Sequence, residues 1–212
     1  MTTSRTRLGA TVVATGALLH ALTTAAPAAT AGPPPVDPGS VTPALNANFA
    51  PWTCWEAGSG ITCQGSWYPE YENEPIGLQC DGHAVHVSGS GTEFMTRWHT
   101  ADGRATRTVV HLDYPGDRYS LSPTGEGPSA TIGGHWNRHY VYTVPGDVSR
   151  RILTEAGAIY LGNRTDGARL HGSGVVTYAA GEDFETVTDA HGLLDHIEDP
   201  ASVDTYICDA LT

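Results

Sequence analysis

The chain has 212 residues and a formal net charge of −12, from 11 arginines, no lysine and 23 acidic residues. This acidity excludes a nucleic-acid partner, because neutralising phosphate requires clustered Lys and Arg. The length suits one domain with or without a tail, and the 40% of hydrophobic residues excludes a wholly disordered chain.

The N-terminus has the three parts of a secretory signal peptide. Arg5 and Arg7 precede an apolar run over residues 10–22, and small residues follow up to an A-x-A cleavage site at Ala29–Ala31. The apolar run is shorter than the roughly 20 residues that a membrane anchor needs. We therefore predict a signal peptide over residues 1–31, a secreted extracellular protein and no membrane anchor after cleavage.

The rest of the chain predicts a short linker and one β domain. Residues 32–48 are rich in Pro and small polar residues and are interpreted as an extended linker. From residue 49 onward, Gly and Pro turn signals separate short β-favouring runs at 84–88, 106–112, 139–144 and 175–179. This pattern predicts an all-β, single antiparallel barrel-like or sandwich domain over 49–212. Only residues 149–158 and 192–198 resemble helix.

Four cysteines in an exported chain predict two disulfides. Of the three pairings, we favour Cys54–Cys63, which closes a short hairpin, and Cys80–Cys208, which ties the C-terminus to the domain. No C-x-x-C pair occurs, which disfavours structural zinc. We expect no metal and no cofactor.

The hairpin over residues 92–112 supplies the candidate ligand site. With residues 101–103 as its loop, Arg97 lies opposite Arg107 and Glu93 opposite His111, while Phe94 is on the core face. Two arginines directly opposite repel, and a bound anion would relieve this. We therefore predict ligand binding by Glu93, Arg97, Arg107 and His111. The alternative is a solvated face on which the arginines point apart.

Two further sets of residues leave alternatives open. His135 and His139 would share a metal only if residues 136–138 formed a tight loop, because a straight strand separates them by about 13 Å. Aromatic side chains near the first disulfide indicate either core packing or stacking on sugar rings; these are Trp52, Trp55, Trp67, Tyr68 and Tyr71.

The stretches LSPTGEGP (121–128) and GGHWNRHYVYTVPGD (133–147) resemble a group of exported actinobacterial proteins with no assigned activity. The Arg-only, Ala- and Gly-rich composition agrees with an actinobacterial source. The resemblance implies export and a β fold, and it transfers no catalytic or ligand-binding residue.

The sequence carries no nucleophile motif: no G-x-S-x-G elbow is present, and S-x-x-K is impossible without lysine. The first functional hypothesis is therefore a secreted, non-catalytic binding or interaction protein, with an unknown small ligand or a surface glycan as its partner. The alternatives are a secreted hydrolase that uses scattered His and carboxylate residues, and a carbohydrate-binding module.

Overall fold

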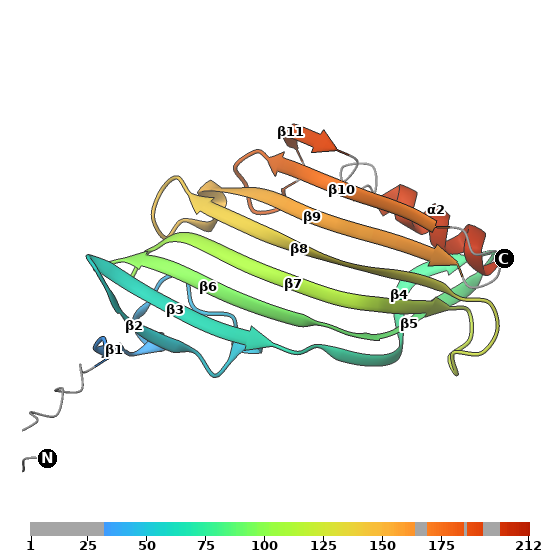
Figure 1. The fold of residues 1–212 in the computed structure, drawn as a ribbon, viewed down its shortest axis with the longest axis horizontal. Helices are drawn as coiled ribbons and strands as arrows, with labels where there is room; N and C mark the ends of the chain where they lie inside the picture. Colours follow the sequence, from blue (N-terminus) through green and yellow to red (C-terminus); the bar gives the residue numbers. More distant parts are fainter. Residues whose placement is uncertain (1–31, 164–168, 185, 193–199) are drawn as a thin grey trace, which may run out of the picture. The chain divides into compact units, whose positions relative to one another are not determined.

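The computed structural model describes residues 32–163, 169–184, 186–192 and 200–212 (Figure 1). The signal-peptide prediction for residues 1–31 lies outside them. Eleven strands form one antiparallel sheet. The strands are β1 (Pro35–Val36), β2 (Thr53–Ala57), β3 (Gly60–Trp67), β4 (Glu70–Cys80), β5 (His83–Ser90), β6 (Thr92–Thr100), β7 (Ala105–Ser120), β8 (Ala130–Tyr142), β9 (Arg151–Asn163), β10 (Arg169–Tyr178) and β11 (Val187–Gly192), accompanied by the 3-10 turns η1 (Pro38–Ser40), η2 (Ala47–Phe49) and η3 (Val148–Arg150) and the helix α2 (Pro200–Leu211).

The strands follow the order β1-β2-β3-β6-β7-β8-β9-β10-β11, and the β4–β5 hairpin joins through β5 to the end of β7 (Figure 1). The predicted all-β antiparallel architecture is confirmed. Within the part of the chain that the structure describes, β1 and β11 are not paired with each other. The sheet is therefore open, and a sandwich-like arrangement fits it better than a closed barrel.

Alternation along the strands gives the sheet two different faces. Residues opposite one another on neighbouring strands share a face, so the register carries each face from strand to strand. We call the face with Cys63, Met95 and Val110 the inner face; these three side chains are buried. The outer face carries Phe94 and His111, which are directly opposite each other and exposed.

The two ends of the described chain cover the inner face. Near β3 and β6, the segment over residues 38–52, which we call the cover segment, buries Val41 and Phe49 against the sheet. On the β4–β5 hairpin, α2 buries Ile207 and Leu211 against Cys80 and Val85. The inner face is thus closed by two local cores that come from opposite ends of the sequence.

The interpretation of residues 32–48 as an extended linker is wrong, because residues 33–48 pack with the sheet. β1 pairs with β2, and residues 33–48 belong to the same compact unit as the sheet. The Thr42 amide donates to the Gly103 carbonyl, and the Ala105 amide donates to the Thr42 carbonyl, both at 2.8 Å. The Pro-rich composition suggested a linker, although the segment also contains apolar side chains, such as Val41, that cover the inner face.

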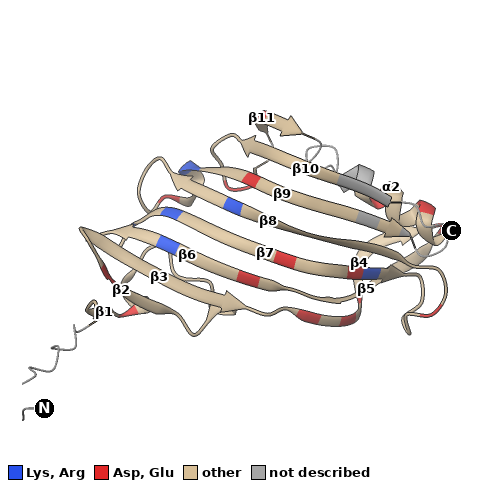
Figure 2. Ribbon diagram, viewed as in Figure 1, with Lys and Arg blue, Asp and Glu red and all other residues tan. Residues whose placement is uncertain are grey.

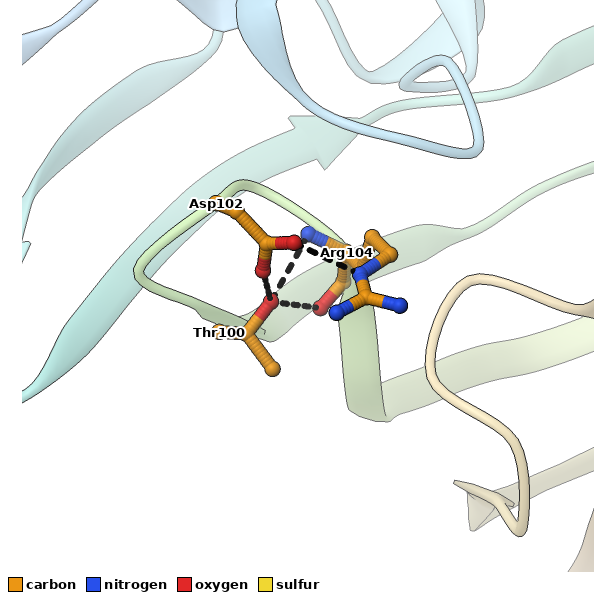
Figure 3. A network of polar contacts seen from close by, with 3 residues as sticks. All are labelled: Thr100, Asp102 and Arg104. Carbon is orange, nitrogen blue, oxygen red and sulfur yellow. Dashed lines mark hydrogen bonds and ion pairs between the residues drawn. The ribbon is translucent and has the colours of Figure 1, made fainter.

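The turn between β6 and β7 has the predicted loop (Figure 3). Gly103 adopts a φ of +81°, and a β-carbon there would meet the Ser40 carbonyl oxygen at 2.8 Å. The Arg104 amide donates to the Thr100 hydroxyl at 3.1 Å, and Arg104 Nε lies 2.8 Å from the Asp102 carboxylate. The hydrogen bond from Thr100 is the main cause that lowers the pKa of Asp102, and Arg104 adds to it. This network fixes the turn from which the hairpin register starts.

A β-bulge then shifts the predicted register by one residue. His99 pairs with Ala105, but beyond the irregularity at Trp98 and His99 the partner of Trp98 is Arg107. Arg97 consequently faces Thr108, and the prediction that it faces Arg107 is wrong. Successive side chains of a strand point to opposite faces of the sheet. A shift of one residue in the pairing therefore places a side chain on the face opposite to that of its expected partner.

The two helix-like stretches have different outcomes. Residues 151–158 belong to β9 and not to a helix, because both edges of this segment pair in register with β8 and β10. Most of residues 192–198 lies outside the described chain. The helix α2, which the sequence analysis did not predict, follows directly after them.

Both predicted disulfides are confirmed. Cys54 and Cys63 are opposite each other on β2 and β3, and Cys80 at the end of β4 is bonded to Cys208 of α2. Two disulfides are typical of an oxidising, extracellular environment. None of the described helices is long and apolar enough to cross a membrane.

The disulfides differ in the length of chain that they enclose, with sequence separations of 9 and 128. Since the chain-entropy contribution rises with loop length, we expect Cys80→Ser with Cys208→Ser to lower the free energy of unfolding by about 5 kcal/mol. The matched pair Cys54→Ser with Cys63→Ser should lower it by about 2.6 kcal/mol. Urea unfolding followed by circular dichroism measures both. Equal losses would contradict the loop-length explanation.

Candidate functional site

The four predicted ligand residues divide between the two faces of the sheet. Glu93 and Arg97 lie on the inner face. On the outer face, Arg107 lies 4.7 Å above the Trp98 ring, and the His111 imidazole stacks on Phe94 with ring centroids 6.4 Å apart. The predicted grouping of all four is therefore wrong, and the bulge in the pairing of β6 with β7 is the reason.

A cavity of about 310 Å³ lies on the inner face and is lined by residues of the cover segment and of β3, β6, β7, β8 and β9. Its walls are half apolar and half polar. The apolar and aromatic lining consists of Phe49, Trp67, Met95, Val110, Tyr140 and Tyr142, and the polar lining consists of Asn46, Glu93, Arg97, Thr108, Arg138 and Arg151. Glu93 and Arg97 are thus the two predicted residues that this cavity retains.

Cross-strand rows bring these side chains together. One row runs from Arg97 through Thr108 to Tyr140, each directly opposite the next. The adjacent row runs from Val110 through Arg138 to Glu155, as part of the same register. Figure 2 shows basic positions on β6 and β8 and beside β9 in the same part of the sheet. The cavity floor is therefore made of strand residues, whose backbone is fixed by hydrogen bonds on both sides.

Arg138 and Glu155 form an ion pair across β8 and β9. Arg138 Nε donates to Glu155 Oε1, and Glu155 is only 5% exposed. Burial lowers the pKa of Arg138, but the charge and hydrogen bond of Glu155 outweigh it and raise that pKa overall. The Glu155 carboxylate is consequently the ion-pair partner of Arg138.

Glu93 has a different partner. The Tyr114 hydroxyl donates to Glu93 Oε1 at 2.5 Å. Burial, followed by this hydrogen bond, raises the pKa of Tyr114 above its usual range, so the phenol stays a proton donor at neutral pH. Tyr114 also stacks on Trp136, with ring centroids 5.6 Å apart. Glu93 is therefore held at the edge of the cavity.

Arg97 holds the cover segment in place. Its Nη1 donates to the carbonyl oxygens of Pro43 at 3.1 Å and Ala44 at 3.3 Å. The residue is 8% exposed, and its Nε is buried without a hydrogen-bond partner. Among the described residues, no carboxylate lies within ion-pair distance of this guanidinium. Arg97 is thus a buried cation whose polar contacts are neutral carbonyls.

Arg151 approaches the cavity from the start of β9. Its guanidinium lies 5.1 Å from the Tyr140 ring centroid and 5.0 Å from that of Phe184. Its Nε is also buried without a hydrogen-bond partner. Aromatic faces attract a guanidinium, which fixes its plane but leaves its N–H groups available.

The sequence contained a signal for the missed residues. Trp136, Arg138, Tyr140 and Tyr142 alternate along β8 and all belong to the inner-face register. The histidines of the same strand, His135 and His139, occupy the other phase of the alternation and therefore the outer face. They lie on one continuous strand, so the tight loop needed for a shared metal is not formed.

The aromatic residues near the first disulfide mostly pack inward. Trp52 and Trp67 contact Phe49, with ring centroids 5.9 and 6.1 Å apart. Trp55 and Tyr71 are half-buried, and Tyr68 is 70% exposed. These residues do not form the exposed, coplanar strip that a carbohydrate-binding module requires.

His99 provides a test of how tightly the inner face is buried. It is 4% exposed, and burial first and the Arg97 charge second lower its pKa from 6.5 to about 4, against a weak opposing effect of the Ile61 backbone. The unfolded chain therefore binds this proton at a higher pH than the folded chain. The stability that neutral His99 provides is complete above pH 6.5 and is lost as the pH falls towards 4.

We expect His99→Leu to remove this pH dependence of the unfolding free energy. Between pH 7 and pH 4, the wild-type protein should lose up to about 3 kcal/mol more unfolding free energy than the variant. Urea denaturation at a series of pH values measures the difference. Parallel pH profiles for the two proteins would show that His99 titrates normally in the fold.

No family model, curated protein or solved structure matches this chain. The resemblance to exported actinobacterial proteins accordingly stays a prediction.

Proposed function

We propose that the protein is a secreted, non-catalytic binding protein that holds a small molecule in the inner-face cavity. The observation that carries this proposal is the cavity of about 310 Å³ between the cover segment and β6–β9. Small-molecule sites are concave, mostly apolar, and in the range of roughly 300–1,000 Å³, with a few polar groups that orient the ligand. This cavity is at the lower end of that range, so it suits a compact ligand.

The chemistry of the lining favours binding over catalysis. Among the described residues, the lining contains no histidine and no cysteine, and the hydroxyl oxygen of Thr108 is buried without a hydrogen-bond partner. A hydroxyl nucleophile requires an adjacent base to remove its proton, and none contacts Thr108. One arrangement proposed for the hydrolase alternative joined His111 to Glu93, but His111 is on the outer face and Glu93 on the inner face. The lining is therefore suited to hold a molecule and supplies no nucleophile–base pair to transform it.

The position of the cavity also supports a binding role. Its floor is part of a continuous sheet, whereas its cover is a segment that is attached to the sheet by hydrogen bonds such as the one from Arg97 Nη1 to the Pro43 carbonyl at 3.1 Å. A rigid floor fixes the polar groups before the ligand arrives, which reduces the entropy lost on binding.

Two neighbouring valines of β7 provide a matched test. Val110 is buried in the cavity lining, and Val109 points to the opposite face. We expect Val110→Phe to fill the cavity and Val109→Phe to leave it open. In a ¹⁹F NMR screen of neutral, anionic and cationic aromatic fragments, compounds that bind the wild-type protein and Val109→Phe should lose at least tenfold in affinity for Val110→Phe.

Thermal unfolding followed by circular dichroism checks that both variants are folded. A screen in which no fragment binds, or in which the fragments bind Val110→Phe as well as they bind Val109→Phe, would rule out the cavity as the binding site.

A further inference from the structure

Positive charge in the cavity exceeds negative charge. Three arginines, Arg97, Arg138 and Arg151, line it, and the carboxylates of Glu93 and Glu155 are the acidic groups beside it. Glu155 is paired with Arg138, and Glu93 accepts the Tyr114 hydroxyl. Two guanidinium groups therefore remain without a carboxylate partner among the described residues, and the local balance is one positive charge.

Two arginines without a carboxylate partner in the described part of the chain lower the stability of the fold when no ligand is bound. A buried charge is normally paired with an opposite charge, because desolvation is otherwise uncompensated. Arg97 is 8% exposed, and burial is the main cause that lowers its pKa; Tyr142 opposes this effect, and the charge of Arg151 adds to it. Because both guanidinium groups line the same cavity, the two like charges repel each other, and an anion between them would remove both penalties.

The unused donors indicate where the anion would lie. Arg97 uses Nη1 for the cover segment and keeps Nε unpartnered, while Arg151 is held by aromatic rings and also keeps Nε unpartnered. The Thr108 hydroxyl, opposite Arg97 in the register, is a third buried polar group without a partner. Three unsatisfied groups in one cavity are unusual, since most buried polar groups in folded proteins are hydrogen-bonded.

We propose that the ligand of this cavity is a small aromatic or apolar monocarboxylate, whose carboxylate is bound between the Arg97 and Arg151 guanidinium groups and whose apolar body lies against Tyr140 and Val110. This inference rests on the proposed binding function. A planar carboxylate matches the N–H donors of guanidinium groups, and the pairing is stronger than a neutral hydrogen bond. The single excess positive charge suits a monoanion, and the aromatic lining suits an organic body in preference to an inorganic ion.

Arginine Nε–H resonances report directly on this site. Benzoate titrated into the ¹⁵N-labelled protein at pH 7 should shift the Nε–H signals of Arg97 and Arg151 in a saturable way. The Arg138 signal is an internal control, because its Nε is already bonded to Glu155. Benzamide, which has the same ring and no charge, should bind at least tenfold more weakly than benzoate.

Matched arginine variants complete the test. Arg151→Met should weaken benzoate binding at least tenfold. Arg107→Met is the control, because Arg107 also stacks on an aromatic ring but on the outer face, and it should change the affinity less than twofold. Arg97 is not used for this purpose, since its loss would also release the carbonyls of Pro43 and Ala44.

Several outcomes would overturn the carboxylate assignment: equal binding of benzamide and benzoate, no saturable shift at Arg97 and Arg151, equal shifts at Arg138, or equal effects of chloride or phosphate. If other fragments still bind in a manner sensitive to Val110→Phe, the binding function stands and only the ligand class fails. If no fragment is sensitive to that substitution, the binding function itself fails.

Discussion

The structure depends on how a single sheet buries one of its two faces. A β-sheet with apolar side chains on one face is stable only when another layer covers that face. Here the covering layer is divided between the segment around Val41 and Phe49 and the helix around Ile207. Because these covers are separate, the part of the inner face beneath and beside the cover segment retains a cavity.

Charge on the inner face follows from the same arrangement. Where the apolar cover is incomplete, inward-pointing strand residues can be polar, provided that their polar groups have hydrogen-bond or ion-pair partners. Arg138 finds Glu155 on the neighbouring strand, and Glu93 finds Tyr114 on another. Arg97 is incorporated in a different manner, because its guanidinium binds carbonyls of the cover segment. The Arg97 side chain therefore connects the cover segment, the sheet beneath it and the candidate site.

The architecture was more predictable from the sequence than the site. Turn signals and β-favouring runs were enough for an antiparallel all-β fold, and cysteine number and spacing were enough for both pairs, Cys54–Cys63 and Cys80–Cys208. The site required the register, which a bulge at Trp98 and His99 altered by one residue. No local pattern announces such a bulge, so Phe94 was wrongly assigned to the core face and Arg97 to the face of Arg107. Pairing between distant strands, such as Arg138 with Glu155, is likewise invisible until the strand order is known.

The division of the cover between the two ends of the chain has a consequence for assembly. Cys80 meets Cys208 only after the 128 residues that follow Cys80 have been made, and contacts of such high sequence separation form slowly. Until then the strands expose an apolar surface and open edges, the features by which partly folded β proteins aggregate. The net charge of −12 acts during this interval, because mutual repulsion keeps incomplete chains apart while the last helix is still missing.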